Sequence, residues 1–309
     1  MSNYYLKDKV NRLLQERKFK AETNAQINAH EAIKNSKYLQ LENKIGELII
    51  EVAKANMNGQ DNYEFEKQII ECKIEQDEIL KSMNMKRSDL SPNYECSICN
   101  DTGFIDGKKC ICAKKLTNQL LRNSCGMPLN ENISFKQCQD VDKKLLDLIK
   151  KICKNYPEEN KTYTNLLLCG NTGVGKTYLT QAMANSFIEK ELLTIFTTAN
   201  NLNNDFLKYH TTFNEEKLKF YEPYIDCDVL IIDDLGTEPV FKNVTAEHLL
   251  NLINERKIKQ KLTIITTNLS GDEIIEKYGE RIFSRLFDKN NCICLQFGEH
   301  DLRLKKETK

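Results

Sequence analysis

A glycine-rich turn between an apolar segment and a helical pattern constrains the fold of this chain more than any other feature. The segment Asn165–Cys169 is apolar after its first residue, and the run that follows it is Gly170-Asn171-Thr172-Gly173-Val174-Gly175-Lys176-Thr177. This run matches G-x-x-x-x-G-K-[ST] without a mismatch. Glycines let backbone N–H groups converge on a phosphate, and the next helix adds the positive end of its dipole. The sequence therefore predicts a phosphate-binding loop, with a chance glycine turn as the alternative.

Two side chains at the end of this loop have the chemistry that a nucleoside triphosphate requires. Lys176 would reach the β- and γ-phosphates, and the hydroxyl of Thr177 would ligate Mg²⁺. The expected cofactors are therefore ATP and Mg²⁺. The whole run from Gly170 to Thr177 forms the predicted nucleotide-binding set.

Predicted strands and helices alternate after the loop. Apolar, strand-like segments cover residues 192–198, 228–234, 262–268 and 292–297. Helical patterns cover residues 178–190, 200–209, 215–225 and 244–259, and another precedes the loop at residues 145–149. This alternation predicts an α/β fold with an open, mostly parallel sheet, whose site lies at the carboxyl ends of the strands.

Polar residues end two of these predicted strands. Asp233 and Asp234 follow the apolar run Val229–Ile232, and Asn268 follows the next strand. We expect Asp233 to hold Mg²⁺, mostly through water, and Asp234 to polarise the water that attacks the γ-phosphate. Asn268 would orient that water or sense the γ-phosphate, although a turn-forming amide is the plainer interpretation. A merely polar strand end is the alternative for the two carboxylates.

Three arginines near the end of the sequence are candidates for contacts with the γ-phosphate. Arg281 and Arg285 are four residues apart and share one helix face. They are either ordinary surface charge or the source of an arginine finger, which a neighbouring subunit supplies in some phosphoryl-transfer enzymes. Arg303 follows the last predicted strand and could touch the γ-phosphate of its own chain.

Four of the twelve cysteines form two close pairs in a turn-rich segment. The pairs are Cys96 with Cys99 and Cys110 with Cys112, ten residues apart. Four thiolates in tetrahedral geometry suit a structural Zn²⁺ ion. An iron–sulfur cluster or four unrelated buried thiols are the alternatives.

The first 85 residues have a helical pattern without any motif that carries chemistry, and they predict a small helical bundle. The 45 Lys and Arg balance the 45 Asp and Glu, so nucleic-acid contact requires a local patch. The first residues lack a hydrophobic signal region, and no apolar run is long enough to span a membrane. We expect a soluble, cytoplasmic protein without a membrane partner. The predicted domains are residues 1–93 (helical), 94–114 (zinc module), 115–132 (linker) and 133–309 (ATPase).

With these residues in place, the chain resembles the DnaC/DnaI/IstB family of AAA+ ATPases. The loop around Lys176 resembles its Walker A motif, and Asp228–Gly236 with Glu238 resembles its Walker B motif. The segment Thr266–Asn268 is similar to sensor 1, Gly279–Leu286 to the arginine-finger box and Gly298–Arg303 to the sensor-2 position. These motifs cover residues 133–309. The cysteine spacing and the Asp-Thr-Gly insert resemble the zinc module of DnaI-like helicase loaders.

The resemblance implies an ATP-dependent loader of the replicative DNA helicase. The helical domain would grip the helicase, and the ATPase domain would assemble into a hexamer-like ring or spiral and hold single-stranded DNA. Only a short tail follows the last predicted strand, so we expect no C-terminal lid. The Ser-Arg-Leu context favours Arg285 over Arg281 as the finger. Lys208 and Tyr209 are guesses for DNA contacts, with core or solvent roles as the plainer interpretation.

Two other functions remain open at this point. One is an IstB-like transposition ATPase, which would bind duplex DNA and recruit a transposase. A basic N-terminal region would favour that role, but residues 1–90 are balanced in charge. The other is a scaffold with an inactive nucleotide site, against which the presence of Lys176, Asp233 and Asp234 argues.

Overall fold

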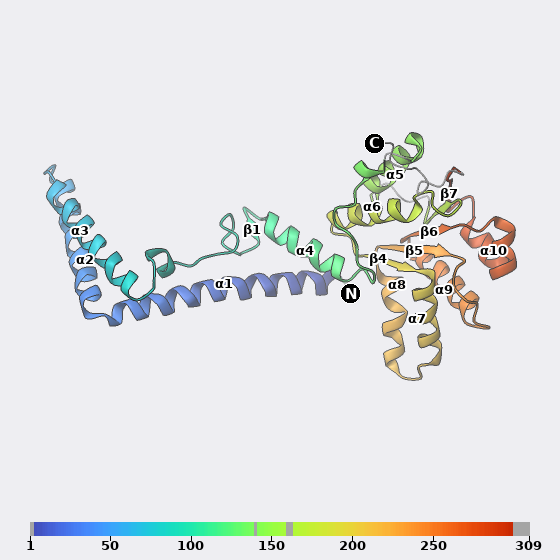
Figure 1. Ribbon diagram of the computed structural model, residues 1–309, viewed down its shortest axis with the longest axis horizontal. Helices are drawn as coiled ribbons and strands as arrows, with labels where there is room; N and C mark the ends of the chain where they lie inside the picture. Colours follow the sequence, from blue (N-terminus) through green and yellow to red (C-terminus); the bar gives the residue numbers. More distant parts are fainter. Residues whose placement is uncertain (1–2, 139–140, 159–162, 299–309) are drawn as a thin grey trace, which may run out of the picture. The chain divides into compact units, whose positions relative to one another are not determined.

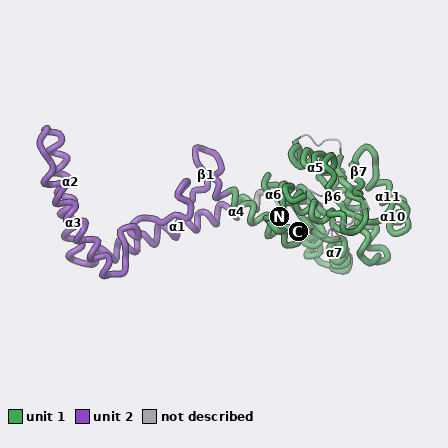
Figure 2. The backbone as a smooth tube through the Cα atoms, turned by 45° about the horizontal axis from the view of Figure 1, so that its top comes forward, with its two compact units in different colours: residues 1–8, 114–309 green, residues 9–113 purple. Residues whose placement is uncertain are grey.

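A computed structural model of this chain describes residues 3–138, 141–158 and 163–298, and Figure 1 shows their helices and strands. The contacts divide the chain into two compact units (Figure 2). Residues 9–113 form one unit, and residues 1–8 with 114–309 form the other. No helix within the described ranges combines the length and the apolar character that a membrane span needs.

The unit of residues 9–113 consists of helices followed by a short hairpin. Its elements are α1 (Asn3–Lys34, which begins in the other unit), α2 (Ser36–Met57), α3 (Tyr63–Ser82), η1 (Arg87–Leu90), β1 (Phe104–Ile105) and β2 (Lys108–Lys109). The side chain of Asn35 separates the first two helices, because its oxygen accepts the N–H groups of Lys37 and Tyr38 at 3.1 Å. The helices α2 and α3 pack on each other, and Ala32 of α1 joins Tyr38 and Leu80 in their buried cluster.

The other unit contains the predicted α/β fold. Its elements are α4 (Ile111–Asn123, which begins in the first unit), η2 (Phe135–Gln137), α5 (Lys143–Asn155), β3 (Asn165–Cys169), α6 (Lys176–Glu189), β4 (Thr194–Thr198), α7 (Ala199–Thr211), η3 (Glu215–Phe220), α8 (Glu222–Asp226), β5 (Val229–Leu235), α9 (Thr245–Ile258), β6 (Leu262–Thr267), α10 (Gly271–Tyr278), α11 (Glu280–Leu286) and β7 (Cys292–Gln296). The helix predicted over residues 215–225 is in fact two pieces. Pro223 near the start of α8 lacks the N–H that a continuous helix would need.

Five strands form one parallel sheet in the order β4-β5-β6-β3-β7. This order places the phosphate-loop strand β3 between β6 and β7, and it places the carboxylate-bearing strand β5 beside β6. The predicted parallel sheet is therefore confirmed. All five carboxyl ends point to one edge, where the loop after β3 lies close to the ends of β5 and β6.

Helices cover both faces of the sheet (Figure 1), which explains why the central strands β3 and β6 are buried along their whole length. On one face, Leu166 and Leu168 pack with residues of α5 and α6. On the other face, Leu167 and Ile265 pack with residues of α7, α9 and α11. The alternation of side chains along each strand thus builds two hydrophobic layers around one sheet.

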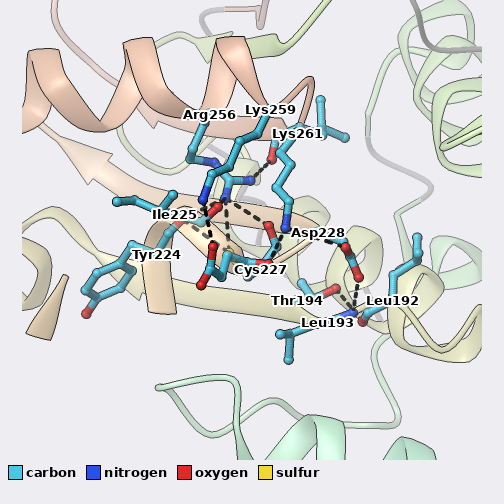
Figure 3. A network of polar contacts seen from close by, with 12 residues as sticks. Leu192, Leu193, Thr194, Tyr224, Ile225, Cys227, Asp228, Arg256, Lys259 and Lys261 are labelled. Carbon is cyan, nitrogen blue, oxygen red and sulfur yellow. Dashed lines mark hydrogen bonds and ion pairs between the residues drawn. The ribbon is translucent and has the colours of Figure 1, made fainter. Parts of the chain in front are cut away.

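A buried arginine holds the amino ends of the strands together (Figure 3). The side chain of Arg256 in α9 is fully buried. Its Nη1 donates to the carbonyl oxygens of Tyr224 (2.6 Å) and Cys227 (3.0 Å), and its Nη2 donates to that of Leu262 (2.6 Å). Its Nε donates to the hydroxyl of Thr263 at 2.9 Å. One guanidinium thereby connects the end of α8, the turn before β5 and the start of β6.

Lysine ion pairs lie beside this arginine. Lys259 contacts Asp226 at 2.8 Å, and Lys261 contacts Asp228 at 3.8 Å. Asp228 also accepts the backbone N–H of Leu193 at 2.9 Å, which connects the segment before β4 to the start of β5. This network lies at the edge of the sheet opposite the phosphate loop, so its role is to hold the framework of the site.

Candidate functional site

The phosphate loop joins the buried strand β3 to the start of α6. Gly173 and Gly175 have φ angles of +85° and +90°, which favour glycine. Gly170 is required for a different reason, because a Cβ there would lie 2.8 Å from the Cβ of Phe297 after β7. The loop therefore keeps its shape through backbone conformation and through close contact with the neighbouring strand.

The ammonium group of Lys176 is held inside this loop. Lys176 is only 6% exposed, and its Nζ donates to the carbonyl oxygens of Gly170 (2.7 Å) and Asn171 (2.8 Å). Carbonyl oxygens are weaker partners for an ammonium than a phosphate is. A phosphate that enters the loop therefore meets a positive charge that is already positioned.

A cavity of about 470 Å³ opens at the loop, and residues of the predicted loop line it together with Asp234 and Asn268. Its volume lies within the usual range for small-ligand sites. The residues that line it are Gln137, Cys138, Val141, Thr172, Gly173, Gly175, Lys176, Thr177, Tyr178, Gln181, Asp234 and Asn268. Five of these lining residues were not predicted: Gln137, Cys138, Val141, Tyr178 and Gln181. They have no motif, and only the fold brings the segment before α5 to the cavity.

The two carboxylates occupy different environments at the end of β5. Asp233 is 3% exposed, whereas Asp234 is exposed and lines the cavity. The pairing between β5 and β6 shifts between Ile232 and Leu235, and Asp234 adopts a left-handed φ of +56°. This bulge turns one carboxylate inward and the next toward the cavity.

Thr266 of β6 fixes both aspartates in these positions. Its hydroxyl donates to Oδ1 of Asp233 at 2.7 Å and accepts the backbone N–H of Asp234 at 2.8 Å. The sequence interpretation placed Thr266 in a sensor-like segment but assigned it no role. A threonine in a strand gives no signal of its own, because threonine is common in strands.

Burial raises the pKa of the Asp233 carboxyl above its ordinary value, while hydrogen bonds from Thr266 and Thr177 oppose that shift. The side chain of Thr177 thus already contacts the carboxylate with which it would share a metal ion. A cation at this position would favour the ionised form of Asp233, which is the form that ligates metal. A hydroxyl, a carboxylate and room for water match the oxygen ligands that Mg²⁺ prefers.

The loop that follows Asp234 is tied to α10. Glu238 is 3% exposed, and its carboxylate accepts the N–H of Gly236 at 3.0 Å and the hydroxyl of Tyr278. The ammonium group of Lys277 donates to the carbonyl oxygen of Glu238 at 2.8 Å. The helix α11, which carries Arg281 and Arg285, follows α10 directly. These contacts therefore connect the loop after Asp234 to the helix with the arginine pair.

Two of the three predicted arginines can be placed, and both lie outside the cavity lining. Arg281 and Arg285 are both exposed on α11, and Arg285 donates to the side chain of Asn254 at 3.1 Å. Neither residue lines the nucleotide cavity of its own chain. Arg303 lies outside the described residues.

The two residues guessed for DNA contact have partners within their own unit. Lys208 forms an ion pair with Asp205 at 2.8 Å, and its ammonium lies 5.4 Å from the ring centroid of Phe220. Tyr209 is half-buried and stacks on Tyr221 with ring centroids 4.8 Å apart.

The four predicted cysteine ligands lie together in the other unit. Their sulfur atoms are all within 4.8 Å of one another, and the Cys96–Cys110 and Cys99–Cys112 pairs are 3.8 Å and 3.4 Å apart. Tetrahedral ligation with Zn–S bonds of about 2.3 Å requires sulfur atoms about 3.8 Å apart. The cluster therefore fits a zinc ion.

The backbone around the cysteines supports the same arrangement. The buried carboxylate of Asp101 accepts the N–H groups of Glu95 and Cys96 at 2.8 and 2.9 Å. The N–H of Gly103 donates to the sulfur of Cys99 at 3.3 Å. N–H groups of Cys99 and Ile98 lower the pKa of the Cys96 thiol to about 7, which favours the thiolate that a metal needs.

Comparison with known proteins gives a family for the larger unit. The family model for the IstB-like ATP-binding protein matches residues 115–309, which is more than half of the chain. This chain belongs to the IstB-like ATP-binding protein family. The phosphate loop, the parallel sheet and this match together identify the AAA+ P-loop fold that was expected, in a family named for ATP binding.

Curated relatives link the family to replication initiation. The chromosomal replication initiator protein DnaA of Campylobacter fetus subsp. fetus is 32% identical over 125 residues, which is 40% of this chain and 28% of that protein. DnaA of Sulfurimonas denitrificans is 40% identical over 73 residues, 24% of this chain and 16% of that protein. The chain spans less than a third of the length of these relatives.

Solved structures give partial overlaps. The crystal structure of the DnaC helicase loader is 25% identical, with a TM-score of 0.41, and the match covers 49% of this chain and 88% of that one. The DnaI crystal structure is 20% identical, with a TM-score of 0.43, and covers 55% of this chain and 90% of that one. At TM-scores below 0.5, the family match and not these overlaps identifies the fold.

Proposed function

We propose that this protein is an ATP-dependent loader of a replicative DNA helicase. Its family supports nucleotide binding, and the cavity at Lys176 offers the groups that ATP and Mg²⁺ need. The four-cysteine segment, which resembles that of DnaI-like loaders, supports the loader role over other roles in the family.

The observation that carries the partner assignment is the apolar surface of the helices α2 and α3. Ile50 and Met57 of α2 are 56% and 88% exposed and lie seven residues apart, which places them on one helix face. Ile70 and Ile74 of α3 are 59% and 55% exposed and share a face for the same reason. Large apolar side chains left in water on adjacent helices are typical of a protein-binding surface. A helicase subunit is the proposed occupant.

Copurification with the host's replicative helicase tests this assignment. The full chain is expected to copurify with the helicase, and Ile70→Glu with Ile74→Glu is expected to abolish the complex. Ile258→Glu is the matched control, because Ile258 is 81% exposed in the other unit. A double variant that still copurifies would overturn the helicase-binding role of α2 and α3.

The proposed chemistry is hydrolysis of the γ-phosphate of ATP. Asp233 and Thr177 would hold Mg²⁺, Asp234 would polarise the attacking water, and Asn268 would orient that water from the cavity wall. Arg285, with Arg281 as the alternative, would reach the site of a neighbouring subunit in a hexamer-like ring or spiral. The exposure of both arginines on α11 is compatible with such a contact.

Arg285→Ala is expected to retain ATP binding and to lower the hydrolysis rate by about 10³-fold, since a finger acts on the transition state. Asp234→Asn is expected to bind ATP without hydrolysis. Mixing the two variants should restore part of the activity, because mixed assemblies contain sites with an intact carboxylate and an intact finger. Steady-state phosphate release measures both effects. A hydrolysis rate of Arg285→Ala equal to that of the wild type would reject Arg285 as the finger. Arg281→Ala tests Arg281 as the alternative finger.

Zinc is the proposed structural metal at the cysteine cluster. Metal analysis is expected to find about one Zn²⁺ per chain, because four thiolates saturate a tetrahedral site. Cys96→Ser should lose the metal and expose residues 94–113 to proteolysis, since structural zinc contributes roughly 10 kcal/mol to such segments. Cys294→Ser, which removes an exposed thiol of β7, is the matched control. A metal-free segment that resists proteolysis would contradict this proposal.

Single-stranded DNA is the proposed nucleic-acid ligand of the ATPase unit. Lys217 and Lys219 lie near the rings of Tyr209 and Phe220, at 5.6 and 5.2 Å from the centroids. Phe213, between α7 and η3, is 99% exposed. Lysines beside aromatic rings suit a strand whose bases are unpaired.

The family match also keeps a second candidate function open, an accessory ATPase for transposition that binds duplex DNA and recruits a transposase. The charge balance of residues 1–90 and the cysteine cluster favour the loader. Copurification with a transposase instead of the helicase would reverse this preference.

A further inference from the structure

A second cavity, of about 560 Å³, has a basic lining and shares no lining residue with the nucleotide cavity. We call it the basic cavity, and it is lined by Lys114, Asn118, Phe135, Lys150, Lys154, Ser186, Glu189 and Lys190. These residues come from α4, η2, α5 and the end of α6, all within the unit of residues 114–309. Because α6 has 14 residues, its end lies about 20 Å from the phosphate loop where it begins.

The charge around this cavity departs from that of the whole chain. Residues 114–154 contain nine Lys and Arg but four Asp and Glu, whereas the complete sequence is balanced. Glu189 is the only acidic residue in the lining, all of which belongs to the described part of the chain. The excess positive charge is therefore local. A chain without net charge needs such a local patch if it is to bind a polyanion.

The lysines differ in how they are engaged. The ammonium of Lys190 donates to the carbonyl oxygens of Lys154 and Tyr156, the latter at 2.8 Å. Lys150 has one distant carboxylate, Asp147 at 3.8 Å. Among the described residues, Lys114 and Lys154 form no ion pair. Two or three ammonium groups are thus available to a ligand, and an ammonium group is a good point-charge partner for phosphate.

The other lining groups suit a nucleotide better than a free anion. Phe135 contributes a half-buried aromatic side chain, on which a base can stack. The side-chain oxygen of Asn118 is buried without a hydrogen-bond partner in the described residues, which leaves an unused acceptor behind the cavity wall. Positive charge beside an aromatic side chain is typical of proteins that bind single strands without sequence preference.

We propose that the basic cavity binds a phosphate-bearing single strand of nucleic acid, with Lys150 and Lys154 on the phosphates and Phe135 against a base. This site is distinct from the ATP cavity. It rests on the single-stranded DNA binding proposed above for the ATPase unit, to which it adds a contact surface apart from the lysines of η3. It stands independently of helicase binding, which was assigned to α2 and α3.

The test is fluorescence anisotropy of a labelled 20-nucleotide oligo(dT) with the full chain, in the presence of saturating ADP and Mg²⁺ to block the nucleotide cavity. Lys150→Glu with Lys154→Glu is expected to weaken binding at least tenfold. It is also expected to reduce the slope of log affinity against log salt by about one to two units, since each phosphate contact on a single strand contributes about 0.7. Phe135→Leu should weaken binding without changing that slope, because a base contact releases no counterion.

Lys67→Glu with Lys81→Glu, on exposed lysines of α3, is the matched control for charge reversal. ADP affinity confirms that each variant is folded. The proposal would be overturned if the wild-type protein did not bind the oligonucleotide, or if Lys150→Glu with Lys154→Glu left the affinity unchanged. It would also be overturned if the control variant lost as much oligonucleotide affinity as the cavity variant. Displacement by polyglutamate as effective as by unlabelled oligonucleotide would also overturn it in favour of an acidic protein partner. Copurification with the helicase is expected to survive in the double variant, so the two proposals can fail separately.

Discussion

Replacing Lys176 with alanine is expected to weaken ATP binding by about 100-fold or more. The ammonium group of Lys176 is nearly buried and lies in the loop that would receive the phosphates. Charge-assisted hydrogen bonds contribute roughly 1.5–3 kcal/mol each, and about 2.7 kcal/mol corresponds to 100-fold in affinity. The loss of two such bonds to the β- and γ-phosphates therefore removes most of the affinity. Nucleotide-dependent assembly should disappear with it.

Titration with a fluorescent ATP analogue measures this effect. Lys242→Ala provides the control, because Lys242 is an exposed lysine of the same unit that does not line the cavity. The melting temperature of Lys176→Ala should stay close to that of the wild type, which separates lost binding from lost folding. ATP affinity that remains unchanged in Lys176→Ala would refute the assignment of the phosphate loop.

Arg256→Met is expected to destabilise the ATPase unit by about 3–5 kcal/mol. Methionine fills much of the volume but removes the guanidinium donors of the buried carbonyl oxygens of Tyr224, Cys227 and Leu262, and each lost hydrogen bond costs roughly 1–3 kcal/mol. For a unit of this size, such a loss lowers the melting temperature by about 6–20 °C. Arg256→Lys should have a melting temperature between those of the wild type and Arg256→Met, because three donors on a flexible stem cannot reach partners on three segments.

Thermal unfolding of the full chain, followed by circular dichroism, tests this expectation. Lys259→Met is the matched control three residues along the chain, where the exposed pair with Asp226 contributes about 0–1 kcal/mol. Equal melting temperatures for Arg256→Met and Lys259→Met would show that the guanidinium network is not a structural requirement.

The sequence predicted the sheet and the phosphate loop well because both rest on local patterns. The run Gly170–Thr177 has a fixed spacing, and the strands β3, β5 and β6 are rich in apolar residues because they are buried on both faces. The cysteine cluster was predictable for the same reason, since each pair of ligands comes from one short turn.

The parts that were missed depend on contacts between distant segments. Thr266 acts on Asp233 and Asp234 only because β6 pairs with β5, and nothing in its own neighbourhood indicates this. The basic cavity collects lysines from three helices, whose separate charges look like solvated surface in the sequence. The helix predicted over residues 215–225 did not take Pro223 into account, although a proline lacks the N–H that a continuous helix needs.

The left-handed backbone at Asp234 determines which substitutions can isolate its chemistry. Aspartate and asparagine tolerate this conformation better than other residues with a side chain, and alanine there costs roughly 1–2 kcal/mol. Asp234→Asn therefore removes the charge and leaves the bulge intact, whereas Asp234→Ala changes charge and main-chain geometry together. Asp234→Gly gives the complementary case, a relaxed main chain without a carboxyl group. Comparing the asparagine and glycine variants would separate the contribution of the acid from that of the turn that presents it.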